Sequence, residues 1–192
     1  GAVVDAHVEV DTGMGRTGVA EDEAFDEIKR VASAPGVRLR GLYTHFPVSD
    51  SDAEFTRAQI VRFLALIDRL RASGIDVGLV HSANTAAVDA ISESRMTMIR
   101  PGLLAYGLHP GGGSGGVDVR PIMSWKSHIA RVRRFPAGRT ISYARSFVTG
   151  RESLIGVVPV GYGHGYPFHL SARGEMLVAG MRVPIVGRVT MD

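Results

Sequence analysis

Residues 6–21 read AHVEVDTGMGRTGVAE, and this stretch decides how the rest of the chain is interpreted. Val8 and Val10 alternate with polar residues, as the side chains of a half-buried strand do. A glycine turn and Arg16 follow, and then the acidic start of a helix. A strand that ends in a glycine turn, with an arginine held at its exit, predicts a site for an anion.

Strand-like and helical segments alternate beyond this stretch, which is typical of βα units around a parallel sheet. We expect helices over residues 21–34 and 51–72, and strands over 37–46, 76–84 and 96–102. The helix over 51–72 is expected to turn six apolar side chains inward. They are Phe55, Ile60, Phe63, Leu64, Ile67 and Leu70.

Polar residues follow the strands at matching positions, namely Arg16, His45, Asn84 and Arg100. The carboxyl ends of the strands carry the functional groups in a β/α barrel, so these four side chains are candidates for one site. Each alone could instead be a satisfied polar residue at the mouth of a loop. Their shared position favours the site.

The second half of the chain predicts an antiparallel β domain, because its strand-like segments are short and separated by Gly or Pro turns. These segments lie near residues 122–133, 141–143, 153–160, 175–179 and 182–191. The glycine-rich run PGGGSGG, residues 110–116, is a flexible breaker. We therefore place one domain at residues 1–110 and an incomplete second domain at 111–192.

The composition is that of a globular chain, with 192 residues, 45% hydrophobic and 21% charged. Neither a membrane span nor a signal peptide is visible, so we expect a cytoplasmic protein with no membrane partner. Cysteine is absent, which removes thiolate chemistry, and no metal site is predicted. The net charge is only +3, and the clustered arginines lack interleaved aromatic residues, so nucleic acid is not an expected partner.

Seven motifs, in order, resemble those of the alanine racemases. They are VDTGMGRTGV, LYTHF, HSANTAAV, IRPGLLAYGL, ISYARSF, VPVGYGHGYP and VGRVTMD, spread from residue 6 to the end. The resemblance implies an α/β fold, the second half of a (β/α)8 TIM barrel followed by an antiparallel β domain. It also implies a homodimer with shared active sites that uses pyridoxal 5'-phosphate to interconvert L- and D-alanine, the latter for peptidoglycan.

The resemblance assigns the cofactor to barrel residues. Arg100 would face the pyridine nitrogen and oppose its protonation, and His45 would bridge Arg100 and the catalytic tyrosine. Thr85, usually serine in the family, would bind the phosphate with the backbone N–H groups of Gly102 and Leu103. Asn84 would lie beside the cofactor. Without the resemblance, His45 could be a buried histidine bonded to backbone, and Asn84 a helix cap.

Residues of the β domain would act across the dimer interface. Tyr143 would be the acid and base on one face of the α-carbon, although a tyrosine packed on a strand is the alternative. Tyr162, Met191 and Asp192 would line the substrate entrance and surround its carboxylate. The family usually has aspartate where this chain has His164, and this difference could alter substrate preference.

Arg16 would contact the substrate carboxylate or the cofactor's phenolate oxygen. The family often carries a carbamylated lysine at the position of Glu9, so we interpret Glu9 as a fixed carboxylate that hydrogen-bonds Arg16. A glutamate that merely faces solvent is the competing interpretation.

The racemisation needs a lysine as Schiff-base partner and second base, and neither Lys29 nor Lys126 has the right setting. We therefore expect a fragment that is inactive alone and requires the N-terminal half of the barrel. Two alternatives stay open: a broad-specificity or serine racemase, and a non-catalytic module that binds the cofactor.

Overall fold

In the computed structural model, the predicted first strand is present as β1 (Val4–Asp11). It lies between β2 (Val19–Ala20) and β3 (Val37–Tyr43), and β4 (Leu79–His81) pairs with the far side of β3. All three pairings are parallel, with His7 opposite Gly41 and Tyr43 opposite His81. The parallel sheet predicted for the first half of the chain is confirmed.

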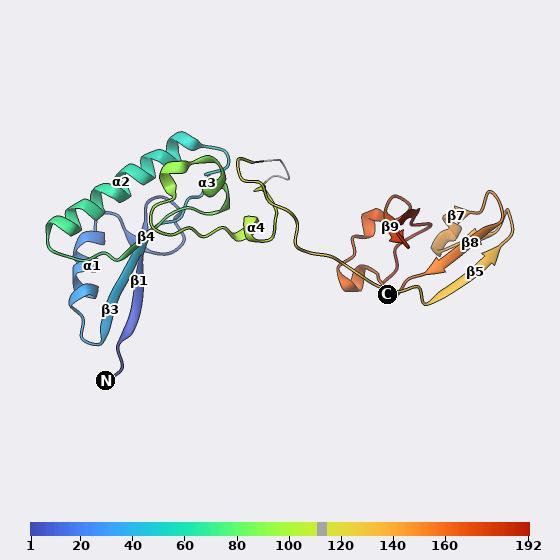
Figure 1. The fold of residues 1–192 in the computed structure, drawn as a ribbon, viewed down its shortest axis with the longest axis horizontal. Helices are drawn as coiled ribbons and strands as arrows, with labels where there is room; N and C mark the ends of the chain where they lie inside the picture. The colour runs from blue at the N-terminus through green and yellow to red at the C-terminus, as the bar shows by residue number, and fades with distance from the viewer. Residues whose placement is uncertain (111–114) are drawn as a thin grey trace. The chain divides into compact units, whose positions relative to one another are not determined.

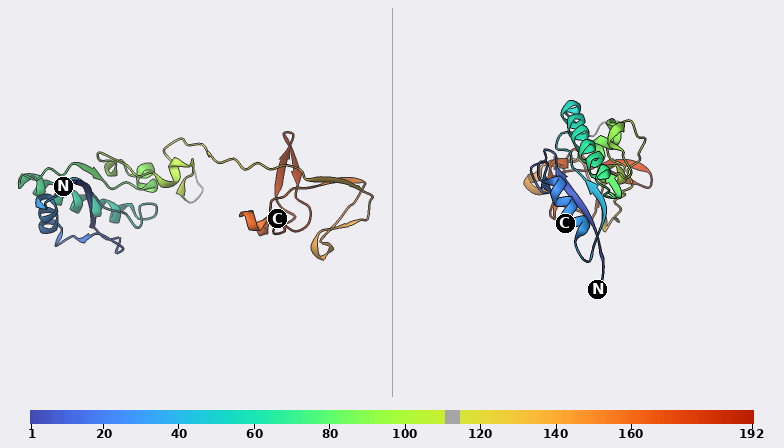
Figure 2. Two further views of the ribbon diagram at one scale, coloured as in Figure 1. Left: turned by 90° about the horizontal axis from the view of Figure 1, so that it is seen from below. Right: turned by 90° about the vertical axis from the view of Figure 1, so that its left-hand side faces the viewer.

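Two helices cover one face of this sheet (Figures 1 and 2), α1 (Ala24–Ser33) and α2 (Ala53–Ala72). Their apolar side chains pack with Val10, Leu42 and Val80 of the strands in one buried cluster. Since side chains alternate along a strand, His7 and Glu9 lie on the opposite face from Val8 and Val10. The sheet therefore has an apolar face under the helices and a polar face.

Helix α2 departs from the prediction at two positions. Ile60, Phe63, Ile67 and Leu70 are buried as expected, but Phe55 is 40% and Leu64 is 39% exposed. The prediction that Phe55 and Leu64 point inward is therefore wrong. The helix ends as predicted, with Gly74 in the left-handed conformation at φ +83°.

The strand predicted over residues 96–102 does not form. Only a single bridge joins Met98 to His81. The backbone N–H of Val80 donates to the hydroxyl oxygen of Thr97 at 2.6 Å. This N–H is therefore not available for the regular strand pairing that a strand over 96–102 would make with β4. The segment nevertheless follows β4, because the N–H of Arg100 donates to the carbonyl of Ala83.

Short helices complete this part of the chain: α3 (Thr85–Ala90), η1 (Ser92–Ser94) and α4 (Gly102–Ala105). A second buried cluster joins α3 and α4 to α2 through side chains that include Ile60, Ala87 and Leu104. Strand β4 is shorter than predicted and stops before Asn84, because the Asn84 side chain caps α3 instead.

The structure describes residues 1–110 and 115–192, and these form an N-terminal unit, Gly1–Met123, and a C-terminal unit, Ser124–Asp192. The predicted breaker at 110–116 falls mostly on residues 111–114, which lie outside the described residues. No helix in the described part of the chain is both long enough and apolar enough to span a membrane.

The C-terminal unit is built from antiparallel strand pairs, as predicted. The pairs are β5 (Arg131–Phe135) with β8 (Ser153–Val157), β6 (Thr140–Ile141) with β7 (Phe147–Val148), and β9 (Glu175–Val178) with β10 (Met181–Pro184). Three short turns of helix lie between strands: η3 (Tyr143–Arg145), η4 (Tyr162–His164) and η5 (Phe168–Leu170).

Candidate active site

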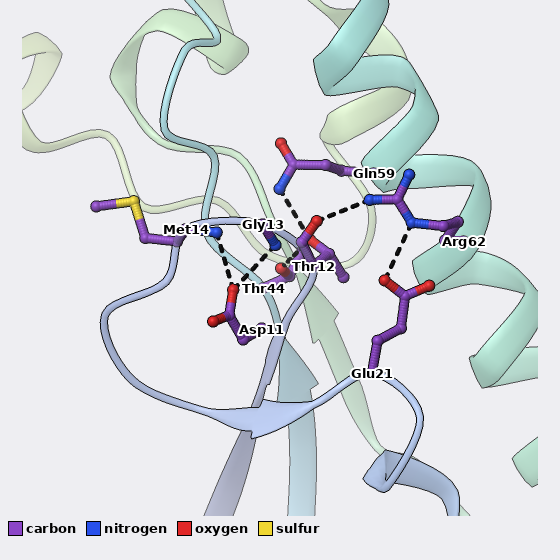
Figure 3. A network of polar contacts seen from close by, with 8 residues as sticks. All are labelled: Asp11, Thr12, Gly13, Met14, Glu21, Thr44, Gln59 and Arg62. Carbon is purple, nitrogen blue, oxygen red and sulfur yellow. Dashed lines mark hydrogen bonds and ion pairs between the residues drawn. The ribbon is translucent and has the colours of Figure 1, made fainter.

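The loop after β1 is organised by the carboxylate of Asp11, which accepts hydrogen bonds from three consecutive backbone N–H groups. Figure 3 shows the first two of them, from Gly13 and Met14. Oδ1 of Asp11 lies 2.9 Å from the nitrogen of Gly13, 2.8 Å from that of Met14 and 3.1 Å from that of Gly15. The N–H groups of Gly15 and Gly13 lower the pKa of Asp11 because they favour its charged form. Arg16 follows this fixed turn and is exposed.

A polar network, buried at Thr12, Thr44 and Gln59, holds the base of this loop against α2 (Figure 3). The hydroxyls of Thr12 and Thr44 lie 2.7 Å apart, and the amide of Gln59 donates to Thr12 at 3.0 Å. Arg62 donates to the carbonyl of Thr12 at 2.7 Å and pairs with Glu21 at 3.0 Å. The ends of β1 and β3 are thus tied to one helix, a contact that no sequence motif indicated.

Arg100 lies at the centre of a second cluster, partly buried between the ends of β3 and β4. Its Nη2 donates to the carbonyl of Thr44 at 2.8 Å and lies 3.3 Å from Nδ1 of His45. Its Nη1 contacts Nδ1 of His81. A guanidinium only donates, so both imidazoles must accept here. The structure therefore brings two of the predicted residues, Arg100 and His45, together.

Both imidazoles beside Arg100 are held neutral. Burial lowers the pKa of His81 to about 4, and the charge of Arg100 adds to the effect. The pKa of His45 is lowered by the same causes, burial first and then the charges of Arg100 and Arg16. Burial also lowers the pKa of Arg100 itself, yet an arginine stays protonated at any ordinary pH. The cluster is thus one fixed cation with two neutral acceptors.

Tyr43 joins Glu9 to this cluster. Its ring stacks on the His81 ring, with centroids 5.0 Å apart and planes at 5°, and the guanidinium of Arg100 lies 5.2 Å from its centroid. Its hydroxyl donates to Oε2 of Glu9 at 3.2 Å. Burial raises the pKa of Tyr43, and the negative charge of Glu9 raises it further.

The carboxylate of Glu9 has two hydroxyl partners, Tyr43 and Thr17, the latter at 2.8 Å. The hydrogen bond expected between Glu9 and Arg16 is not among the contacts of the described residues. Glu9 is partly buried, so the alternative of a glutamate that simply faces solvent does not describe its surroundings.

Thr85, Gly102 and Leu103 lie together, as predicted for a phosphate site. Oγ1 of Thr85 accepts from the backbone N–H of Leu103 at 2.9 Å, and a Cβ added at Gly102 would lie 3.7 Å from that oxygen. Asn84 has a structural role. Its Oδ1 accepts from Ser49 at 2.7 Å and from the N–H of Ala87 at 3.1 Å, which makes it the cap of α3.

The predicted residues of the C-terminal unit converge on one hollow of about 450 Å³. Its lining consists of Tyr143, Tyr162, Phe168, Arg188, Val189, Thr190, Met191 and Asp192. The hollow forms because η4 packs on the end of the chain, with the N–H of Tyr162 donating to Thr190 at 2.9 Å. Tyr143 is 70% exposed and follows Ser142, which has a φ of +70°.

The sequence analysis did not predict three residues of the Arg100 cluster, namely His7, Tyr43 and His81. The available signal was their position: each is a polar or aromatic residue on the face of a strand that does not enter the helix-covered core.

Two family models match, the alanine racemase N-terminal domain over residues 1–110 and the alanine racemase C-terminal domain over residues 122–192. Alanine racemase of Halothermothrix orenii is 41% identical over 192 residues, covering 99% of this chain and 51% of the relative. That of Desulfosudis oleivorans is also 41% identical, covering 100% of this chain and 52% of the relative.

Solved structures agree with these matches. The alanine racemase from E. faecalis aligns with a TM-score of 0.82 at 34% identity, over 99% of this chain and 51% of that one. The alanine racemase of Clostridium difficile 630 aligns with a TM-score of 0.83 at 30% identity, over 100% of this chain and 50% of that one. The chain spans about half the length of the curated relatives it matches.

Proposed function

The chain belongs to the alanine racemase family, and on this premise we propose that it provides one part of an enzyme that interconverts L- and D-alanine. Family membership also confirms the fold class, part of a β/α barrel followed by an antiparallel β domain. The observation that carries the proposal is the Arg100 cluster, in which a permanent cation is held by neutral acceptors.

The residues present fit pyridoxal 5'-phosphate. When bound, this group supplies a conjugated ring that delocalises the electron pair left by removal of the substrate's α-proton. Arg100 would donate a hydrogen bond to its ring nitrogen. Since a guanidinium only donates, that nitrogen would have to be the acceptor and carry no proton. The hydroxyl of Thr85, which accepts the N–H of Leu103, would donate its own proton to the phosphate, with Gly102 beside it. Asn84 would lie at the edge of this site.

His45 is proposed to orient the catalytic tyrosine. It faces Arg100 with Nδ1 as acceptor, so its neutral ring carries the proton on Nε2 and offers that N–H to a further partner. We assign this partner as Oη of Tyr143 from a second copy of the chain, where Tyr143 gives and takes the proton on one face of the substrate. The 70% exposure of Tyr143 supports a role toward a partner chain.

The remaining predicted residues are proposed to bind substrate. Arg16, on its rigid turn, would meet the carboxylate of the amino acid, and Tyr162, Met191 and Asp192 would shape the entrance beside Tyr143. Glu9 is proposed to act through Tyr43. Its carboxylate accepts a hydrogen bond from the Tyr43 hydroxyl and so holds the Tyr43 ring in the Arg100 cluster.

The base on the opposite face is proposed to be a lysine in the part of the relatives that this chain does not match. Lys29 is exposed on α1, with its ammonium 5.5 Å from the ring of Phe25, and Lys126 is exposed in the C-terminal unit. We further propose, from family membership, a cytoplasmic homodimer that supplies D-alanine for peptidoglycan.

A chimera tests this function. It joins this chain to the part of the Halothermothrix orenii racemase that the chain does not match, and racemisation of L-alanine is followed by chiral chromatography with L-serine as competing substrate. We expect turnover of alanine that Arg100→Ala abolishes. Comparable turnover of alanine and serine would support a broad-specificity racemase, and turnover of serine alone a serine racemase. Cofactor binding without any turnover would support the non-catalytic module. Each of these results would contradict the proposal.

A further inference from the structure

His7 and His81 meet across the strand that separates them in the sheet. His7 lies on β1 opposite Gly41 of β3, and His81 lies on β4. Nδ1 of His7 and Nε2 of His81 are nevertheless only 2.8 Å apart. This is the length of a hydrogen bond, so one of the two nitrogens carries a proton and the other accepts it.

Gly41 makes this contact possible. A Cβ added there would lie 2.6 Å from both Cε1 and Nδ1 of His7, and 2.6 Å from the carbonyl oxygen of Leu79. A side chain therefore cannot occupy this position while His7 crosses β3. The backbone of Gly41 does not need the left-handed conformation, so the glycine is required for the space that it leaves.

Arg100 sets the direction of the hydrogen bond. Its guanidinium donates to Nδ1 of His81, so the neutral His81 ring must carry its proton on Nε2. That N–H points at Nδ1 of His7, which accepts it. His81 is only 4% exposed, so without His7 the N–H would be buried without this partner.

We propose that His7 is a positioning residue of the racemase site, which holds the ring of His81 against Arg100 by accepting its Nε2–H. The inference rests on the proposed function in one respect, that Arg100 faces the cofactor ring. The chain of contacts does not move a proton, because an arginine does not release one. Its role is to fix how the guanidinium is aimed.

NMR of the whole chain with ¹⁵N-labelled histidine rings tests this inference without cofactor. We expect wild-type His81 to carry its proton on Nε2 only. In His7→Leu this N–H should exchange with solvent at least about tenfold faster, the factor that corresponds to about 1.4 kcal/mol for an unpaired buried donor. His7→Asn, whose side-chain oxygen can replace Nδ1 as acceptor, should restore slow exchange.

Two further variants sharpen the result. Gly41→Ala should reproduce the fast exchange of His7→Leu with both histidines intact, whereas His169→Leu, at an exposed site in the C-terminal unit, should change nothing. A proton on Nδ1 of wild-type His81, or wild-type exchange in His7→Leu, would overturn the inference. An inactive chimera with a protected His81 proton would refute the proposed function alone.

Discussion

The hydroxyl oxygen of Thr85 accepts a hydrogen bond from the backbone N–H of Leu103 at 2.9 Å. This bond joins the start of α3 to the start of α4 and places a hydroxyl and an N–H side by side. Thr85→Val keeps the shape of the side chain and removes the acceptor. We expect the free energy of unfolding to fall by about 1–3 kcal/mol, because the N–H loses its partner.

Thr85→Ser is the matched control, since it keeps the hydroxyl and removes only a methyl group. In the chimera it should bind pyridoxal 5'-phosphate nearly as tightly as wild type, while Thr85→Val should bind at least about tenfold more weakly. Fluorescence titration with the cofactor measures both. Equal affinities for the two variants would remove Thr85 from the phosphate site.

The stability of the loop after β1 should depend on the charge of the Asp11 carboxylate. Asp11→Asn weakens three hydrogen bonds from backbone N–H groups, so we expect a loss of about 1 kcal/mol in urea unfolding. Because its pKa is lowered in the folded chain, the carboxylate contributes stability above the ordinary pKa of aspartate. That contribution is lost as the pH falls through the lowered value. Asp68→Asn, on the exposed side of α2, should have little effect.

His81 predicts how stability depends on pH. Its pKa is about 4 in the folded chain, against about 6.5 for an ordinary histidine, so between these values the unfolded chain binds more protons. Stability from this group is therefore complete above about pH 6.5 and declines as the pH falls toward about 4. Urea unfolding at a series of pH values gives the free energy of unfolding as a function of pH. This free energy should change less steeply with pH over this window in His81→Gln than in wild type, and an unchanged pH dependence would contradict the assignment.

Glu9 predicts the behaviour of Tyr43. Glu9→Gln removes a negative charge from beside the phenol, so the pKa of Tyr43 should fall, but burial should still hold it above its ordinary value. Ultraviolet titration of tyrosinate in wild type and variant measures the change. Glu21→Gln is the control, since Glu21 pairs with Arg62 instead. An unchanged Tyr43 titration in Glu9→Gln would show that Glu9 does not act through it.

Local patterns in the sequence predicted part of this structure well. Val8 and Val10 gave the orientation of β1, because strand alternation alone decides which face meets the helices. Asn84 was readable as a helix cap from its side chain and position. The side chains of Phe55 and Leu64 were misplaced, because a helical period does not reveal how wide a stripe the sheet covers.

The contacts within the site could not be predicted from local sequence patterns. The meeting of His7 with His81 depends on strand order and on the space above Gly41, and neither is a local property of the sequence. The segment near Met98 looked like a strand by composition, but the hydroxyl of Thr97 competes for the hydrogen bonds of β4. Side-chain competition of this kind is visible only in three dimensions.

The central claim is that Arg100 and His45 of one chain work with Tyr143 of another as a single racemase site. Deuterium incorporation at the α-carbon of L- and D-alanine, compared between the chimera and its Tyr143→Phe variant, tests it most directly. We predict that the variant loses exchange from one enantiomer by at least about a hundredfold more than from the other. Equal losses from both enantiomers, or no loss from either, would contradict the claim.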